Sequence, residues 1–275
     1  MIKISVLMCI HSCTDHKHFA EALKSISIDQ TRIPDEFIIV FDGIVKSSIK
    51  NHIELFKIEH GLMIKIIQIR SSKGLGNALK VGIENCNGDF IARMDDDDIS
   101  LPSRIELQEN FLSSNTHVDI VGSWISYFSE DKSCQFINGK IIQYPKTHAD
   151  CFKQFRYRDP MAHPAVMFNK SYFEKAGNYS NLRKSQDTEL WCRGFLQKCI
   201  FGNIPQVLLK YRFDSNTIKK RSEVSTLISY MKLRIKINKT FSFGLKSYLG
   251  LFFYFIIFAF ASKKIIFFLY KIRSD

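Results

Sequence analysis

The sequence predicts an α/β protein with a mainly parallel, doubly wound sheet. Short apolar runs rich in β-branched residues alternate with segments whose apolar residues recur at helical spacing. Strands alternating with helices in this way are typical of parallel sheets covered by helices. The 275 residues are 45% hydrophobic and 24% charged, a globular composition with enough apolar material for a large core.

The first half of the chain supplies most of this pattern. Buried strands are expected at residues 2–10 and 37–41, and further strands at 64–69 and 90–94. Residues 2–10 lack a basic leader and a cleavage site, so they are interpreted as a strand and not as a signal peptide. Helices are expected at 19–28, 49–58, 75–83 and 102–113. Lys73-Gly74 forms a glycine turn before the third helix, and Pro102 opens the fourth.

The second half is less regular. It predicts short strands at 118–122, 165–168 and 207–213, a strand or hairpin at 135–143, and a helix at 186–197. The composition shifts near Ser222, which divides the chain into a domain of residues 1–215 and a basic, apolar helical extension of residues 216–275.

The C-terminal extension has a membrane-like composition. Residues 248–262 are almost wholly apolar and uncharged, and Lys263-Lys264 separates them from a second apolar run at 265–270. A membrane-spanning helix needs roughly 20 apolar residues, so this run is short for a span unless the two lysines snorkel. One reading is a buried core helix; the favoured one is a helix in the membrane surface with lysines on anionic head groups.

The net charge and the cysteines indicate the kind of partner and the compartment to expect. The net charge is +12, with 39 Lys and Arg against 27 Asp and Glu, which favours an anionic partner. Much of the excess lies after Lys232, where Asp275 is the single acid. These charges lie beside an apolar, Phe-rich run and do not alternate with aromatic residues as they do in a base-stacking platform. This arrangement argues against a nucleic-acid partner. Seven Cys without a Cys-x-x-Cys pair argue against zinc and a disulfide framework, and fit a reducing cytoplasm.

Four consecutive acids follow the strand at 90–94. Asp95, Asp96, Asp97 and Asp98 repel one another, so they form either a solvated acidic turn or the site of a bound cation. Open α/β sheets bind ligands at the carboxyl ends of their strands. Alternate residues point the same way, so Asp95 and Asp97 can face one cavity while Asp96 faces elsewhere. Two carboxylates with diphosphate oxygens suit Mg²⁺ or Mn²⁺.

Other candidate residues have a plain structural reading beside the functional one. Asp42 ends a neighbouring strand, where it can accept hydrogen bonds from a base or ribose or belong to an Asp-Gly turn. Lys73 can hold a phosphate or lie in an exposed loop. Asp187 can be a first-turn acid of the helix at 186–197. His163, before a proline, can be a structural histidine.

The chain resembles the inverting glycosyltransferases of family 2, which have the GT-A fold, over about residues 1–215. It is similar to the bacterial members that extend O-antigen, capsule or exopolysaccharide units. The resemblance rests on Ile4-Ser5-Val6-Leu7-Met8, Asp42-Gly43, Gly74-Leu75, residues 85–98, Pro102 with Arg104, His163-Pro164, Gly177 with Tyr179, and Gln186-Asp187-x-Glu189-Leu190-Trp191. Thr188 departs from the pattern, since the family often has an aromatic residue there.

The resemblance implies a role for each matching residue. Asp187 matches the catalytic base, which removes the proton of the acceptor hydroxyl as that oxygen attacks the anomeric carbon. The implied nucleotide-sugar contacts are Asp42, Lys73, Asp95 and Asp96, although Asp96 is the likeliest of the four acids to be spare. The implied metal ligands are Asp97, Asp95 and Asp98, holding Mn²⁺ or Mg²⁺. His163 and Trp191 are candidates for the acceptor pocket.

These observations predict a metal-dependent, inverting glycosyltransferase that uses a nucleotide-sugar, most simply a UDP-sugar. The expected acceptor is a polyprenyl-diphosphate-linked saccharide. The enzyme is then expected in the cytoplasm, bound peripherally to the inner face of the cell membrane through its C-terminal helices. The alternatives are a metal-dependent nucleotidyltransferase, a basic nucleic-acid-binding protein, and a membrane-associated scaffold with a degenerate transferase fold.

Overall fold

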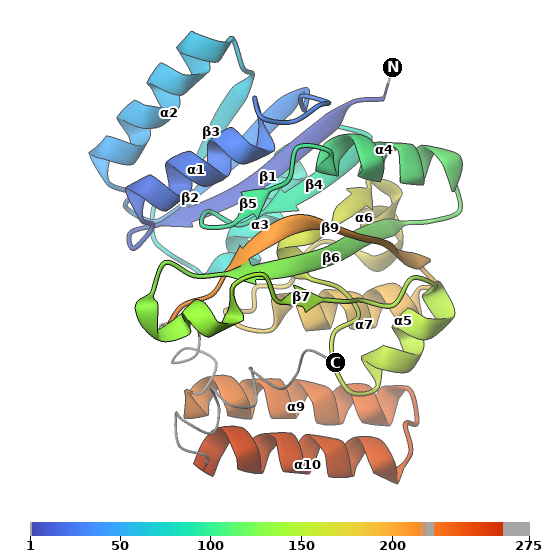
Figure 1. Cartoon of the computed structure of the whole chain (residues 1–275). Coiled ribbons are helices and arrows are strands. Elements are labelled where there is room, and N and C mark those ends of the chain that lie inside the picture. Colours follow the sequence, from blue (N-terminus) through green and yellow to red (C-terminus); the bar gives the residue numbers. More distant parts are fainter. Residues whose placement is uncertain (1, 216, 218–222, 261–275) are drawn as a thin grey trace.

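The computed structural model of the chain describes residues 2–215, 217 and 223–260 (Figure 1). In this part of the chain a nine-stranded sheet has the order β3-β2-β1-β4-β8-β6-β9-β5, with β7 paired to β6. The strands are β1 (Ile4–His11), β2 (Glu36–Asp42), β3 (Ile64–Ile69), β4 (Phe90–Met94), β5 (Ile99–Ser100), β6 (Ile120–Phe128), β7 (Ile141–Ile142), β8 (Met167–Asn169) and β9 (Phe201–Arg212).

Helices cover both faces of the sheet and extend beyond it (Figure 1). The α-helices are α1 (His16–Ile26), α2 (Ser47–His60), α3 (Leu75–Asn85), α4 (Arg104–Ser114), α5 (His148–Phe155), α6 (Ser171–Ala176), α7 (Gln186–Leu196), α9 (Val224–Thr240) and α10 (Leu245–Phe260). Two short 3₁₀ helices are η1 (Lys132–Ile137) and η2 (His163–Ala165).

The sheet is mixed but mainly parallel, as the sequence predicts. Strands β3, β2, β1 and β4 run parallel to one another, and β6 is parallel to β9. Strand β8 runs antiparallel between β4 and β6, and β5 is antiparallel to β9. Because β2 and β4 both flank β1 in parallel, their carboxyl ends meet at one edge. Asp42 and the acidic turn after β4 therefore lie on the same side of the molecule.

The two faces of the sheet bury two separate apolar clusters. Alternate residues of β1, such as Ile4, Val6 and Met8, face a cluster that α1, α2 and α4 cover. Leu7 faces the opposite cluster, to which α3, α5, α6 and α7 contribute. Burial on both faces explains why these strands read as continuous apolar runs.

The middle of the chain differs from the expectation. Residues 135–143, expected as a strand or hairpin, form the end of η1, a turn at Gly139 with φ of 78°, and the two-residue strand β7. Cys134 and Ile137 are buried from η1, so burial there follows a helical spacing. Strands β6 and β9 are longer than predicted because they pair with each other from Ile120 to Phe128. The added strand residues include polar ones, so the alternation of apolar residues along the sequence does not predict them as strand.

The C-terminal helices α9 and α10 lie side by side below the sheet domain (Figure 1). Helix α9 is docked through buried side chains, among them Leu227, Arg234 and Ile237. Among the described residues, no helix has both the length and the apolar character that a membrane crossing requires. The lysine pair at 263–264 and the apolar run at 265–270 lie outside the described residues. The proposed division at residue 215 falls between the end of β9 and the start of α9.

Candidate active site

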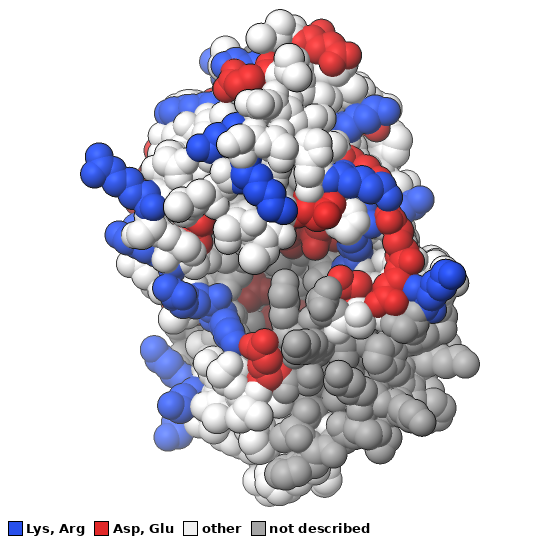
Figure 2. Space-filling view, turned by 90° about the vertical axis from the view of Figure 1, so that its left-hand side faces the viewer, with Lys and Arg blue, Asp and Glu red and all other residues white. Residues whose placement is uncertain are grey.

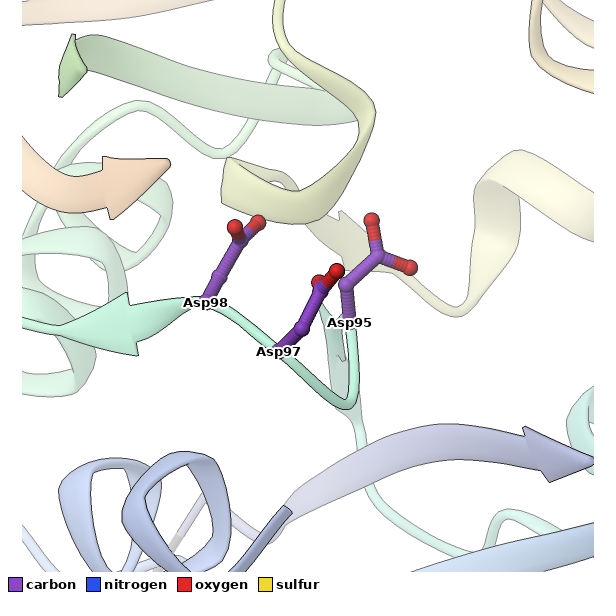
Figure 3. Close-up of side chains that lie close together, drawn as sticks. All are labelled: Asp95, Asp97 and Asp98. Carbon is purple, nitrogen blue, oxygen red and sulfur yellow. The ribbon is translucent and has the colours of Figure 1, made fainter. Parts of the chain in front are cut away.

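The acidic turn lies between β4 and β5. Asp95, Asp97 and Asp98 each offer one carboxylate oxygen, and these oxygens lie within 4.8 Å of one another. Figure 3 shows that the three side chains project from the turn toward the same side. On the face of the molecule drawn in Figure 2, acidic side chains gather around a hollow and lysine and arginine side chains flank them.

Asp98 is the most deeply placed of these acids, with 1% of its surface exposed. Its Oδ1 accepts a hydrogen bond of 2.8 Å from the backbone N–H of Arg212. Its Oδ2 is buried and has no hydrogen-bond partner among the described residues. Burial, and then the charges of Asp97 and Asp95, raise the pKa of Asp98 well above its usual value. A buried, unpaired carboxylate oxygen beside two other carboxylates has the character of a cation ligand.

Arg212 holds the turn in place. Its Nε donates a hydrogen bond of 2.7 Å to the backbone carbonyl of Asp97. Its two terminal nitrogens form ion pairs of 2.8 Å with Glu21 and Glu130, and its guanidinium lies 4.5 Å from the centre of the Phe128 ring. A guanidinium with this many partners has little freedom, so the carbonyl that it contacts is kept in one position.

The residues of the turn fit a divalent cation. Three carboxylates converge from one side, and one of them has a buried oxygen that no protein donor satisfies. Oxygen ligands from a few carboxylates, completed by substrate phosphates and water, are what Mg²⁺ and Mn²⁺ prefer. Asp95, Asp97 and Asp98 would hold the cation. Asp96 is turned aside, and its carboxylate accepts a hydrogen bond from the Thr14 hydroxyl after β1.

Arg93 connects the turn to the interior of the site. Its side chain is 3% exposed and forms an ion pair with Asp95. Its Nε and Nη1 are buried without a hydrogen-bond partner among the described residues. Buried guanidinium donors without an acceptor are costly, and they are well placed to bind an anionic or hydroxyl-bearing ligand.

Asp42 lies at the end of β2, as expected, and organises the loop at residues 72–74. Its carboxylate accepts hydrogen bonds from the Ser72 hydroxyl at 2.7 Å and from the backbone N–H groups of Lys73 and Gly74 at 2.9 and 3.0 Å. The side chain of Lys73 is exposed. Asp42 thereby positions the loop that begins α3, whose N-terminus is an anion-binding element of parallel α/β folds.

Asp187 lies in the first turn of α7 and is partly buried. Its Oδ1 accepts a hydrogen bond of 2.9 Å from the backbone N–H of Thr188. Ser185, which precedes the helix, has a left-handed φ of 57°, a conformation that non-glycine residues rarely adopt. Burial, and then the negative charge of Asp159, raise the pKa of Asp187 to about 6. A carboxyl with this pKa is mostly ionised at neutral pH and can accept a proton.

His163 and Trp191 occupy different environments. His163 opens η2, and its Nε2 lies 2.8 Å from the Tyr179 hydroxyl. Burial, and then the charge of Arg93, lower the pKa of His163 well below its usual value. Trp191 is 0% exposed and packs against His163 and Phe168 with ring centres 5.9 Å apart in both pairs. The structure places Trp191 in the core behind His163, so only His163 reaches the site.

One cavity of about 1020 Å³ brings several candidates together. Asp95, His163 and Asp187 line it from the sheet domain, together with Arg93. The opposite wall comes from α9 and α10 and includes Tyr230, Arg234, Asn238, Leu251 and Tyr254. Asp42 and Lys73 are not part of its described lining. The cavity is large enough for a saccharide, and it lies between the sheet domain and the C-terminal helices.

Four residues of this site have no signal in the residue pattern that would assign them a role. Arg93 and Arg212 sit in or at the end of strands, where an isolated arginine reads as a surface residue. Asp159 follows an irregular aromatic segment, and Arg234 reads as the polar face of an amphipathic helix. Only their burial and their partners in the folded chain identify them.

Comparisons with known proteins identify the family of the chain. The family model for glycosyl transferase family 2 matches residues 5–177. An Escherichia coli protein named UDP-Gal:alpha-D-GlcNAc-diphosphoundecaprenol beta-1,3-galactosyltransferase is 34% identical over 230 residues, which cover 84% of this chain and 81% of that protein. The amylovoran biosynthesis glycosyltransferase AmsE of Erwinia amylovora is 29% identical over 241 residues, covering 86% of this chain and 87% of its own length.

Solved structures share the fold at low sequence identity. Staphylococcus aureus TarS residues 1–349 with UDP-GlcNAc superposes with a TM-score of 0.62 at 13% identity, covering 94% of this chain and 81% of that one. The mannosyltransferase PcManGT of Pyrobaculum calidifontis with GDP-Man and Mn²⁺ gives 0.60 at 13% identity, covering 84% and 64%. These likenesses confirm the GT-A fold. The chain belongs to glycosyl transferase family 2.

Proposed function

We propose that this glycosyltransferase moves a sugar from a UDP-sugar to a hydroxyl group of a polyprenyl-diphosphate-linked saccharide, with inversion at the anomeric carbon. The observation that carries the proposal is the shared cavity. Asp95 of the acidic turn and Asp187 of α7 line one space, which puts a candidate leaving-group site and a candidate base on the same substrate. Direct displacement needs these two groups on opposite sides of the reacting carbon.

The donor end is assigned to the acidic turn and the loop that Asp42 organises. A divalent cation held by Asp95, Asp97 and Asp98 would offset the charge that builds up on the departing nucleoside diphosphate. Arg212 keeps the turn rigid through the carbonyl of Asp97. The loop at 72–74, fixed by Asp42, lies where the nucleoside would bind, with Lys73 free to reach a phosphate.

The acceptor end is assigned to Asp187. Its carboxylate would take the proton of the acceptor hydroxyl while that oxygen forms the new glycosidic bond. The pKa of about 6 keeps the carboxylate ionised at neutral pH without making it too weak a base. His163, neutral because of its burial, offers a hydrogen-bonding side chain to the bound saccharide.

The nature of the acceptor is proposed from the relatives. The E. coli relative is named for transfer to GlcNAc-diphosphoundecaprenol, and others are named for amylovoran and O-antigen biosynthesis. We take the acceptor class from the first of these names, a saccharide carried on a lipid diphosphate. This supports a role in surface polysaccharide biosynthesis at the cytoplasmic face of the membrane.

Helix α10 has the surface that such a location requires. Five large apolar side chains are exposed along it at spacings of one helical face: Leu245, Leu249, Phe252, Phe253 and Ile256. The surrounding sequence is basic, with Asp275 as the single acid after Lys232. An exposed apolar face in a basic segment matches an anionic lipid surface, so we assign this face to the membrane.

The transfer reaction is tested with the purified full chain, Mn²⁺ or Mg²⁺, and a synthetic GlcNAc-diphospho-lipid. UDP-Gal, UDP-Glc, UDP-GlcNAc and GDP-Man are supplied in turn, and products are identified by mass spectrometry and by the anomeric coupling constant in NMR. The expected result is transfer from one UDP-sugar, dependent on the metal, with an inverted linkage, and lost in Asp187→Asn. Retained activity in Asp187→Asn would overturn the assignment of the base. Release of pyrophosphate from a nucleoside triphosphate would favour a nucleotidyltransferase instead.

Membrane binding is tested by cosedimentation with vesicles of phosphatidylglycerol and phosphatidylethanolamine. The expected result is binding that weakens when Phe252 and Phe253 are both changed to Ser, at unchanged thermal stability because both side chains are exposed. Equal binding of the wild type and this variant would contradict the assignment of the α10 face.

A further inference from the structure

Helix α9 reaches into the active site through a buried arginine. Arg234 is 1% exposed, although it lies on a helix outside the sheet domain. Its Nη1 donates to the backbone carbonyl of Phe155 at 2.7 Å, and its Nε donates to the Tyr230 hydroxyl at 2.9 Å. Its Nη2 forms an ion pair of 2.7 Å with Asp159. Burying a guanidinium requires partners of this kind, and Arg234 has one for each of its three nitrogens.

Asp159 connects Arg234 to α7. Its Oδ1 is bound to Arg234, and its Oδ2 accepts a hydrogen bond of 2.8 Å from the Thr188 hydroxyl. Thr188 is 1% exposed, and its backbone N–H donates to the Asp187 carboxylate. A continuous series of hydrogen bonds therefore runs from α9 through Asp159 and Thr188 to the candidate base.

Two residues of this series, Asp159 and Arg234, are also charged groups that interact with the Asp187 carboxylate. The negative charge of Asp159 raises the pKa of Asp187, and the positive charge of Arg93 from β4 lowers it. Arg234 from α9 faces the same carboxylate. The hydroxyls of Tyr179 and Tyr230 also face it. Asp159 and Arg234 thus act on Asp187 with opposite signs from one ion pair.

We propose that Arg234 is a positioning residue for Asp187, acting through Asp159 and Thr188, so that the docked α9 helix fixes and tunes the base. This assignment rests on the proposed function of Asp187 as the base. It gives the C-terminal extension a part in the reaction in addition to any membrane contact. The Thr188 hydroxyl then has a specific part, because its hydrogen bond joins Asp159 to α7.

The two partners of the ion pair make opposite predictions for the pH profile. In Arg234→Met the charge of Asp159 is no longer balanced, so the acidic limb of the kcat/KM profile should move to higher pH. In Asp159→Asn the charge that raises the pKa is gone, so the limb should move to lower pH. Each shift should be about 0.5 pH unit or more, since the charges are close to the carboxylate. A purely structural defect would move both variants in the same direction or not at all, and either result would overturn the proposal.

Matched variants separate geometry from folding. Arg234→Lys keeps the charge and should return the limb toward the wild-type position. Thr188→Val removes the hydrogen bond to Asp159 without a change in charge and should lower kcat about 10-fold with a smaller change in KM. Thr188→Ser keeps the hydroxyl and should have a kcat close to that of the wild type. Lys236→Met removes a charge from an exposed position of the same helix and should leave the profile unchanged. Equal kcat in Thr188→Val and wild type would count against the proposal.

A measurement without substrates distinguishes failure of this proposal from failure of the proposed function. Carboxyl ¹³C NMR of aspartate-labelled full chain gives the titration of Asp187 directly, with the signal assigned by its loss in Asp187→Asn. Opposite shifts in Arg234→Met and Asp159→Asn would support the link even if no sugar transfer were found. Transfer by the wild type with unchanged titration in both variants would uphold the function and refute the link.

Discussion

Asp98→Asn tests the metal site most directly, because the structure predicts opposite effects with and without a cation. The carboxylate of Asp98 is buried, and one of its oxygens has no partner. Keeping it charged, buried and beside the charges of Asp97 and Asp95 costs about 1–3 kcal/mol, and the uncharged amide of an asparagine avoids this cost. An asparagine has nearly the same shape, and its Oδ1 can still accept the hydrogen bond from the Arg212 backbone. The substitution should therefore stabilise the metal-free protein.

The magnitude can be worked out for a thermal unfolding assay. At about 2 °C per kcal/mol for a chain of this size, the metal-free Asp98→Asn variant should melt roughly 2–6 °C above the wild type. Wild type in Mn²⁺ at 100 times its Kd should gain about 2.7 kcal/mol, or roughly 5 °C. The variant should lose most of that gain because one charged ligand is missing.

The assay is a melting curve of both proteins in EDTA and in a Mn²⁺ titration. Asp29→Asn is the matched control, since Asp29 is exposed and pairs only loosely with Lys24 at 3.8 Å, and its effect should lie within about 0.5 kcal/mol. The reasoning is refuted if Asp98→Asn melts below the wild type in EDTA and still gains the full Mn²⁺ shift. That outcome would mean that Asp98 stabilises the fold and does not serve as a cation ligand.

Three further predictions concern the base, the turn and the packing of α3. Because Asp187 acts ionised and its pKa is raised to about 6, kcat/KM should rise with pH up to about 6 and level off above it; Asp187→Asn should lose about 10²–10⁴-fold in rate. Arg212→Met frees the carbonyl of Asp97 and should weaken Mn²⁺ binding about 10-fold or more in isothermal titration. An unchanged Kd would show that the turn is rigid without it. Gly76→Ala places a Cβ 2.4 Å from two backbone carbonyl oxygens and should cost about 1–3 kcal/mol of stability, whereas Gly244→Ala, with nothing within 4 Å, should be near neutral.

Much of the fold follows from local patterns in the sequence. The buried strands β1, β2 and β4 appear as mostly apolar runs because helices cover both faces of the sheet, whereas the edge strand β3 is only partly buried. The glycine turn before α3 and the proline before α4 mark helix starts by their backbone preferences alone. Because parallel strands end at one edge, the sequence also predicts that Asp42 and the acidic turn lie near each other.

The middle of the chain is where local reasoning was insufficient. The strand or hairpin expected at 135–143 is confirmed only at Ile141–Ile142, which form β7, because η1 buries Cys134 and Ile137 at helical spacing in a segment with no clear period. The full lengths of β6 and β9 come from their pairing with each other, which involves residues about 80 positions apart. No window along the sequence contains that information.

The sequence by itself determined which residues carry charge and chemistry: four acids after a strand, an Asp-Gly at a neighbouring strand end, and an acid at the start of α7. The tertiary structure decided which of them act together. It turned Asp96 away from the other acids, put Trp191 in the core, and brought Arg93 and Arg234 to the site. The physical reason is that a buried charge is stable only with its partners, and those partners come from segments that meet only in the folded chain.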